Sequence, residues 1–176
     1  WPLWYRDTYA SAATINTYVT KADAVGAASL AYSMAYAVND GYDTSAIKED
    51  WILREDNGSY WQRDFGSQWW VQLPPNTPEP QNHMTMMNVN NKGWRDYITG
   101  QYVNQKDEFK FTGTHIDTLG QTVKKDASGN KLNLTEGLSA LVNETAEQTK
   151  GAVGINLPDG AGNDKVIPGS STYLYT

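Results

Sequence analysis

The sequence contains no cysteine, which excludes disulfide bonds and thiolate metal sites but leaves the compartment open. It has no apolar run of the roughly 18 residues that a membrane-spanning helix needs. Lysine and arginine number 14 against 20 acidic residues and form no dense cluster, so nucleic-acid phosphates lack a basic surface to bind. The chain starts at Trp1 without an initiator Met or a signal peptide, and we expect this to be a processed or truncated end.

Aromatic residues are abundant, with seven Trp and eleven Tyr among 176 residues. Several lie beside polar and Gly/Pro-rich stretches, where a hydrophobic core would not require them. A flat ring beside hydrogen-bonding groups suits a sugar, which has an apolar face and a polar rim. The alternative for any single residue is an ordinary core or surface aromatic. A chain of this length forms one domain or part of one.

Helical and strand patterns alternate along the chain. Cap residues and apolar periodicity predict helices over 11–26, 91–107 and 136–150, with Ser11, Asn91 and Thr135 as N-cap candidates. Short apolar runs predict parallel strands over 29–38, 110–117, 152–157 and 171–175. Between them, 43–88 reads as a long and therefore functional loop. The order predicts an α/β fold with its site at the carboxyl ends of the strands.

The segment Gly113–Gly120, GTHIDTLG, is the densest candidate for chemistry. It lies where a buried strand reaches the surface, so the carboxylate of Asp117 can be shielded from water and directed at an anomeric carbon. His115 shares the strand face of Asp117 at a spacing of two. The alternative is a strand-end Asp that caps the following turn.

This segment resembles the nucleophile segment of glycoside hydrolase family 66, the dextranase and cycloisomaltooligosaccharide glucanotransferase family. Three further segments resemble the family in order and spacing: WPLWYRD (1–7), SLAYSMAYAVNDGYDTSAIKEDWIL (29–53) and MNVNNKGWRDYITGQY (87–102). The resemblance therefore spans nearly the whole chain.

The resemblance implies that residues 1–176 are a partial catalytic domain, truncated at both ends, that forms about half of a (β/α)8 TIM barrel. It implies a secreted or cell-surface bacterial enzyme without a cofactor, a retaining endo-glycosidase that cleaves α-1,6-glucosidic bonds in dextran. Asp117 would be the catalytic nucleophile. The family's acid/base Glu would follow Thr176, so we expect the chain alone to be inactive.

Substrate contacts follow from the same resemblance, which implies that α-glucan is bound by His115, Trp4, Tyr5, Tyr36 and Asn156. Four of these could equally be core or turn residues: Trp4, Tyr5, Tyr36 and Asn156. Asp7 departs from the family's frequent His, which puts substrate contacts at that edge in doubt. A cluster of acidic residues could bind a hard cation, or form a solvated acidic loop: Asp40, Asp43, Glu49 and Asp50.

Two other functions fit the sequence. A cyclising isomaltooligosaccharide glucanotransferase would share the fold and the nucleophile, and would differ in which acceptor reaches the glycosyl-enzyme. A non-catalytic glycan-binding protein would keep the aromatic cleft without the acid/base. Product analysis separates the first from a dextranase, and binding without sugar release would identify the second.

Overall fold

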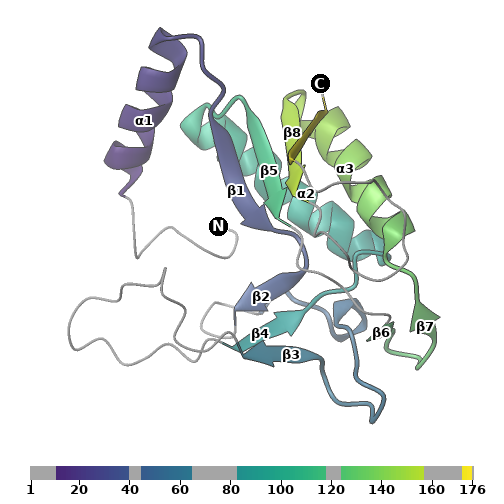
Figure 1. Cartoon of the computed structure of the whole chain (residues 1–176). Coiled ribbons are helices and arrows are strands. Elements are labelled where there is room, and N and C mark those ends of the chain that lie inside the picture. The colour runs from purple at the N-terminus through teal and green to yellow at the C-terminus, as the bar shows by residue number, and fades with distance from the viewer. Residues whose placement is uncertain (1–10, 40–44, 65–82, 118–123, 157–171, 176) are drawn as a thin grey trace, which may run out of the picture.

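The computed structural model describes residues 11–39, 45–64, 83–117, 124–156 and 172–175. Within these residues a mostly parallel sheet carries two helices on one face, and a small antiparallel sheet lies beyond the carboxyl ends of its strands (Figure 1). The α/β class predicted from the sequence is confirmed.

Three α-helices are described: α1 (Ala12–Ala24), α2 (Lys92–Phe109) and α3 (Thr135–Thr149), together with the 3-10 turn η1 (Glu49–Trp51). Ser11 caps α1, since its hydroxyl accepts from the backbone N–H of Thr14 at 3.2 Å. Asn91 caps α2, since its side-chain oxygen accepts from the N–H of Gly93 at 2.8 Å. Both caps satisfy amide groups that the first helical turn cannot pair, and both predictions are confirmed.

The start of α3 differs from the prediction. Thr135 is the first helical residue and not the N-cap, which is Leu134 and makes no side-chain cap bond. Asn133 accepts from the N–H of Thr135 at 3.0 Å, and Asn90 accepts from the N–H of Gly137 at 2.9 Å. The prediction was wrong because part of the capping comes from a segment more than forty residues away.

The main sheet has the strand order β1 (Leu30–Met34), β5 (Gly113–Asp117), β8 (Ala152–Asn156) and β9 (Thr172–Tyr175). The first three strands pair in parallel, as predicted. The prediction that the last strand is also parallel is wrong, because β9 pairs antiparallel with β8. A parallel return requires a long crossover that is usually helical, and the connecting sequence 157–171 contains two Pro and three Gly without a helical period.

The apolar run 29–38 forms two strands and not the single predicted one. β1 ends at Met34, and β2 (Ala37–Asn39) pairs with a different sheet. Two carbonyls at the break are bound elsewhere: Ala35 O accepts from Trp94 Nε1 at 2.9 Å, and Tyr36 O accepts from the Met87 N–H at 2.6 Å. The chain leaves the main sheet here because helix α2 and the segment that precedes it supply these donors.

Residues 43–88, expected to be a loop, contribute two strands to the antiparallel sheet. Its order is β2, β4 (His83–Met86) and β3 (Gln62–Asp64). A separate hairpin is formed by β6 (Lys124–Lys125) and β7 (Lys131–Leu132), and residue 54 bridges to it. Four-residue and shorter strands of this kind give little periodic signal in a sequence.

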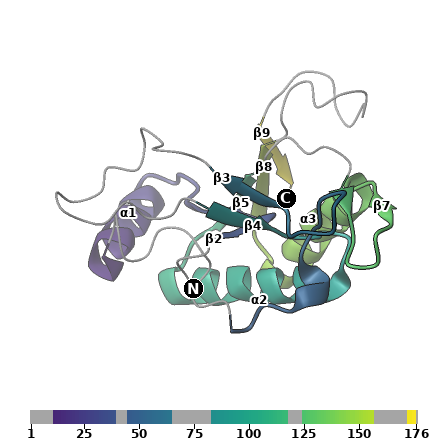
Figure 2. The same cartoon turned by 90° about the horizontal axis from the view of Figure 1, so that it is seen from below.

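One hydrophobic cluster joins the two sheets to α2 and α3. From α2, Trp94, Ile98 and Tyr102 are fully buried, and Leu141 is fully buried from α3. Burial of each such side chain contributes about 1.5–3 kcal/mol. Figure 2 shows α2 and α3 side by side against one face of the sheet. The opposite face of the sheet is therefore the one available for a site.

Candidate active site at the carboxyl edge of the parallel sheet

The carboxyl ends of the three parallel strands are in register. Met34, the last residue of β1, pairs with Asp117, the last residue of β5, and Asp117 pairs with Asn156, the last residue of β8. On the far side, Thr172 of β9 pairs with Asn156. The backbone therefore brings two of the predicted site residues, Asp117 and Asn156, to adjacent positions on one edge of the sheet.

The neighbouring row of the sheet contains His115. It pairs with Tyr32 of β1 and with Gly154 of β8. The rings of Tyr32 and His115 are stacked, with centroids 5.9 Å apart and planes 19° from parallel. His115 and Asp117 lie two residues apart in the regular strand β5, which is the spacing on which their predicted shared face depends.

That face is turned away from the helices. The alternate residues of the same strands are buried against α2 and α3, with Thr114 and Ile116 at 0% and Ile155 at 3% exposure. On the other face Tyr32 is 43% exposed and His115 is half-buried. Tyr32 and His115 thus lie on the accessible face of the sheet.

The remaining predicted contacts are placed differently. Tyr36 is only 2% exposed and belongs to the hydrophobic cluster, and its carbonyl binds Met87. Its burial favours the core alternative for this aromatic ring. Trp4 and Tyr5 lie outside the described residues.

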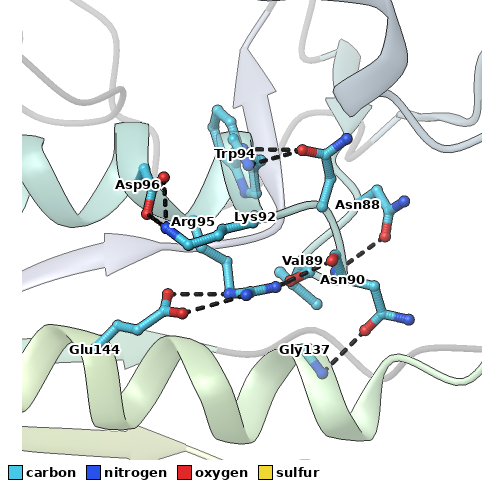
Figure 3. Close-up of polar contacts among 11 residues, drawn as sticks. Asn88, Val89, Asn90, Lys92, Trp94, Arg95, Asp96, Gly137 and Glu144 are labelled. Atoms are coloured by element: carbon cyan, nitrogen blue, oxygen red, sulfur yellow. Dashed lines mark hydrogen bonds and ion pairs between the residues drawn. The ribbon is translucent and has the colours of Figure 1, made fainter.

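An ion-pair network supports the segment that enters α2 (Figure 3). Arg95 donates from Nε and Nη2 to the two carboxylate oxygens of Glu144, at 3.0 and 3.2 Å, and from Nη1 to the carbonyls of Val89 and Asn90, both at 3.0 Å. One guanidinium therefore ties the 89–90 backbone to helix α3. The sequence reasoning missed this pair, whose partners are 49 residues apart.

Asn88 and Asn90 complete the network. Asn88 accepts from the Asn90 N–H at 3.0 Å, and Asn90 donates from Nδ2 to the Asn133 carbonyl at 2.7 Å. Figure 3 shows the bond in which the Gly137 N–H donates to Asn90 Oδ1. The absence of a side chain at Gly137 leaves room for the 89–90 segment, because a methyl group there would collide with Asn90 Oδ1 and with the Val89 carbonyl. The Asn-rich string at 87–91 is the signal that could have indicated such a joint.

Metal ligands are not clustered in the described part of the chain, where no group of three or more His, Cys, Asp or Glu side chains could hold an ion. Of the acidic residues considered for a cation, Glu49 pairs with Arg54 at 2.8 Å, and Asp40 and Asp43 lie outside the described residues. No helix described here is long and apolar enough to span a membrane.

A pocket of about 340 Å³ lies between residues 54–58 and the β6–β7 hairpin. Of the three carboxylates that line it, Asp126 accepts from the backbone N–H groups of Ser128 and Asn130 at 2.9 Å each. Desolvation acts to raise the pKa of Asp126, but hydrogen bonds from Asn130, Ser128 and Gly129 outweigh it and lower that pKa below 3.8. Asp126 therefore stabilises the hairpin turn.

Comparison with known proteins gives one family and a small set of relatives. The family described as Glycosyl hydrolase family 66 matches residues 1–176. Two proteins of Niallia circulans named cycloisomaltooligosaccharide glucanotransferase are 24% and 25% identical to the chain. They cover 82% and 93% of the chain, which spans only 14% and 17% of their lengths.

A solved structure has a similar fold. It is the crystal structure of a Paenibacillus sp. cycloisomaltooligosaccharide glucanotransferase complexed with cycloisomaltoheptaose, with a TM-score of 0.67 and 23% identity. The match covers 81% of this chain and 20% of that one.

Proposed function

Because the chain belongs to glycosyl hydrolase family 66, we propose that it is the nucleophile-bearing part of a retaining endo-glycosidase that cleaves α-1,6-glucosidic bonds in dextran. The observation that carries the proposal is the position of Asp117, the last residue of the central parallel strand, in register with Asn156. The carboxyl edge of a parallel sheet is where barrel enzymes bind and transform their substrates.

The fold supports a barrel as the larger architecture. Parallel strands β1, β5 and β8 with α2 and α3 on one face are the arrangement of a (β/α)8 barrel wall. In that architecture the accessible face with Tyr32 and His115 would be the barrel interior, and the antiparallel sheet after β1 would belong to its rim. The likeness to the glucanotransferase structure is consistent with this assignment.

The proposed mechanism assigns covalent chemistry to Asp117. Its carboxylate attacks the anomeric carbon while a general acid, a Glu that follows Thr176 in the proposal, protonates the leaving glycosidic oxygen. The resulting glycosyl-enzyme ester is then opened by water that the same Glu deprotonates, which regenerates Asp117 and retains the anomeric configuration. His115 and Asn156 would contact the sugar from the same edge, and Trp4 and Tyr5 are proposed as further contacts.

A cyclising glucanotransferase is the second candidate, because both curated relatives carry that name. It would use the same Asp117 ester, but a hydroxyl at the far end of the bound glucan would replace water as acceptor. The difference is one of acceptor access, since the bond that breaks and the nucleophile are the same.

The test is product analysis of the full-length protein with dextran. Release of linear isomaltooligosaccharides supports the dextranase proposal if NMR of the new reducing ends shows that the anomeric configuration is retained. Cyclic products support the second candidate. Binding of isomaltooligosaccharides without any new product would refute both and identify a glycan-binding protein.

We further propose that the protein is secreted or displayed on the cell surface by a bacterium, since an enzyme can reach a dextran polymer only outside the cell. Residues 1–176 alone should release no sugar, because a leaving oxygen without a proton donor is a poor leaving group. An active 176-residue chain would refute the assignment of the acid/base beyond Thr176.

A further inference from the structure

We propose that Gly154 and Tyr32 are positioning residues that hold the imidazole of His115 in a fixed slot, one row from Asp117. The inference rests on the proposed function, in which a sugar bound for attack by Asp117 contacts His115. It adds two residues whose side chains need not contact the substrate.

Gly154 supplies one wall of the slot by what it lacks. A methyl group at Gly154 would lie 2.8 Å from His115 Nδ1, and its next neighbour would be Leu30 Cδ1 at 3.4 Å. Gly154 is not among the glycines with a positive φ, which are Gly26, Gly58 and Gly129. Space for the imidazole, and not backbone conformation, therefore explains this glycine.

Tyr32 supplies the opposite wall. It pairs with His115 on the other side of β5, and the two rings are nearly parallel at a centroid distance of 5.9 Å. Parallel stacking of two aromatic rings at such a distance is a favourable arrangement. Tyr32 is 43% exposed, so burial of its own ring stabilises the fold little. The role of the ring is to cover the imidazole of His115.

The slot matters because of its distance from the reacting edge. Two residues along a parallel strand span roughly 6.6 Å, so the backbone of His115 lies about that far from the backbone of Asp117. A group held there by its neighbours loses little rotational freedom when substrate binds, and small displacements of such groups cost large factors in rate. Gly154 and Tyr32 therefore act through His115.

The test is a coupling experiment in the full-length protein, with kcat and KM for dextran and the crystal structure of each variant. Gly154→Ala should rotate the His115 ring away from β8 and lower kcat/KM by about tenfold or more. In a His115→Ala background, Gly154→Ala should cause no further loss, because the ring it displaces is gone. Tyr32→Ala should remove the ring stack and part of the activity.

Gly100→Ala is the matched control, because a methyl group at this position on α2 meets no atom of another described element within 4 Å. A His115 ring that does not move in Gly154→Ala would overturn the inference. So would a loss of kcat/KM on Gly154→Ala that is equally large in the His115→Ala background, which would indicate a general distortion of the sheet. If the parent protein fails to turn over dextran, the proposed function fails. The ring position in Gly154→Ala still decides the slot in that case.

Discussion

Arg95 and Glu144 form a two-point ion pair between helices α2 and α3, with nitrogen–oxygen distances of 3.0 and 3.2 Å. The side chains are only 12% and 24% exposed, respectively. The same guanidinium also binds two carbonyls of the segment that enters α2. Arg95 therefore fixes the mutual placement of three parts of the chain, which an isolated surface pair could not do.

Removal of either partner should loosen α3. Arg95→Met leaves Glu144 and two carbonyls without their donor, and we expect the opening free energy of the α3 amides to fall by about 1–3 kcal/mol. Native-state hydrogen exchange on the full-length protein measures it. Glu144→Gln should cost less, and the double variant should cost less than the sum.

The exposed pair of Lys92 and Asp96, four residues apart on α2, is the control for this experiment. Lys92→Met should change the same quantity by about 0.5 kcal/mol or less. An equal effect of the two substitutions would contradict the role given to Arg95.

Gly137→Ala should be strongly destabilising although it lies in a helix, where alanine is normally preferred. The added methyl group would collide with Asn90 and with the Val89 backbone, so the 88–90 segment must move and lose its bonds. Gly100→Ala in helix α2 meets no atom and should instead stabilise by about 0.5–1 kcal/mol. Opposite signs in thermal unfolding are the expected result, and a stabilised Gly137→Ala protein would show the collision to be unimportant.

Asp117→Asn in the full-length protein should leave glucan binding nearly intact and lower turnover by several orders of magnitude. The amide keeps the shape of the side chain but cannot form the glycosyl ester. Isothermal titration with isomaltooligosaccharides and a reducing-sugar assay measure the two quantities separately. Strong residual turnover by the Asn variant would show that another carboxylate is the nucleophile.

The β6–β7 turn should become less stable in acid because of Asp126. Its pKa is lower in the folded protein than the ordinary value of 3.8, so its contribution is fully present above about pH 4 and is lost as the pH falls through the folded pKa. At neutral pH, the Ser128 and Asn130 amides should be better protected from hydrogen exchange in the parent protein than in the Asp126→Asn variant. This difference in protection should shrink toward about pH 3. A constant difference would exclude the carboxylate as the cause.

The sequence predicted the helices well because their signals are local. Ser11 and Asn91 act as caps where expected, and the apolar stripe of α2 at Trp94, Ile98 and Tyr102 is the buried face. It predicted the break after Met34 poorly, since the donors that end β1 come from Trp94 and Met87, more than fifty residues later. Tertiary hydrogen bonds of this kind leave no periodic trace in the strand itself.

For the site, the two-residue period along 113–117 predicts that His115 and Asp117 share one face, and the structure has the strand β5 over these residues. The register with β8, which pairs Asn156 with Asp117, joins segments about forty residues apart and leaves no local signal in the sequence. The role of Gly154 could not be predicted, because a glycine that leaves space for a ring on the next strand resembles any other glycine in a one-dimensional sequence. The antiparallel direction of β9 was accessible in principle from the Pro- and Gly-rich connection before it.

The break between β1 and β2 also separates two kinds of evolutionary freedom. Among the residues that the structure describes, β1 pairs with β5 alone and β2 with β4 alone, so no ladder of hydrogen bonds continues there from one sheet into the other. Substitutions and length changes in the antiparallel sheet can accumulate without shifting the register that sets Asp117 beside Asn156. A lineage could therefore remodel the antiparallel sheet while Asp117, the proposed nucleophile, is inherited in place.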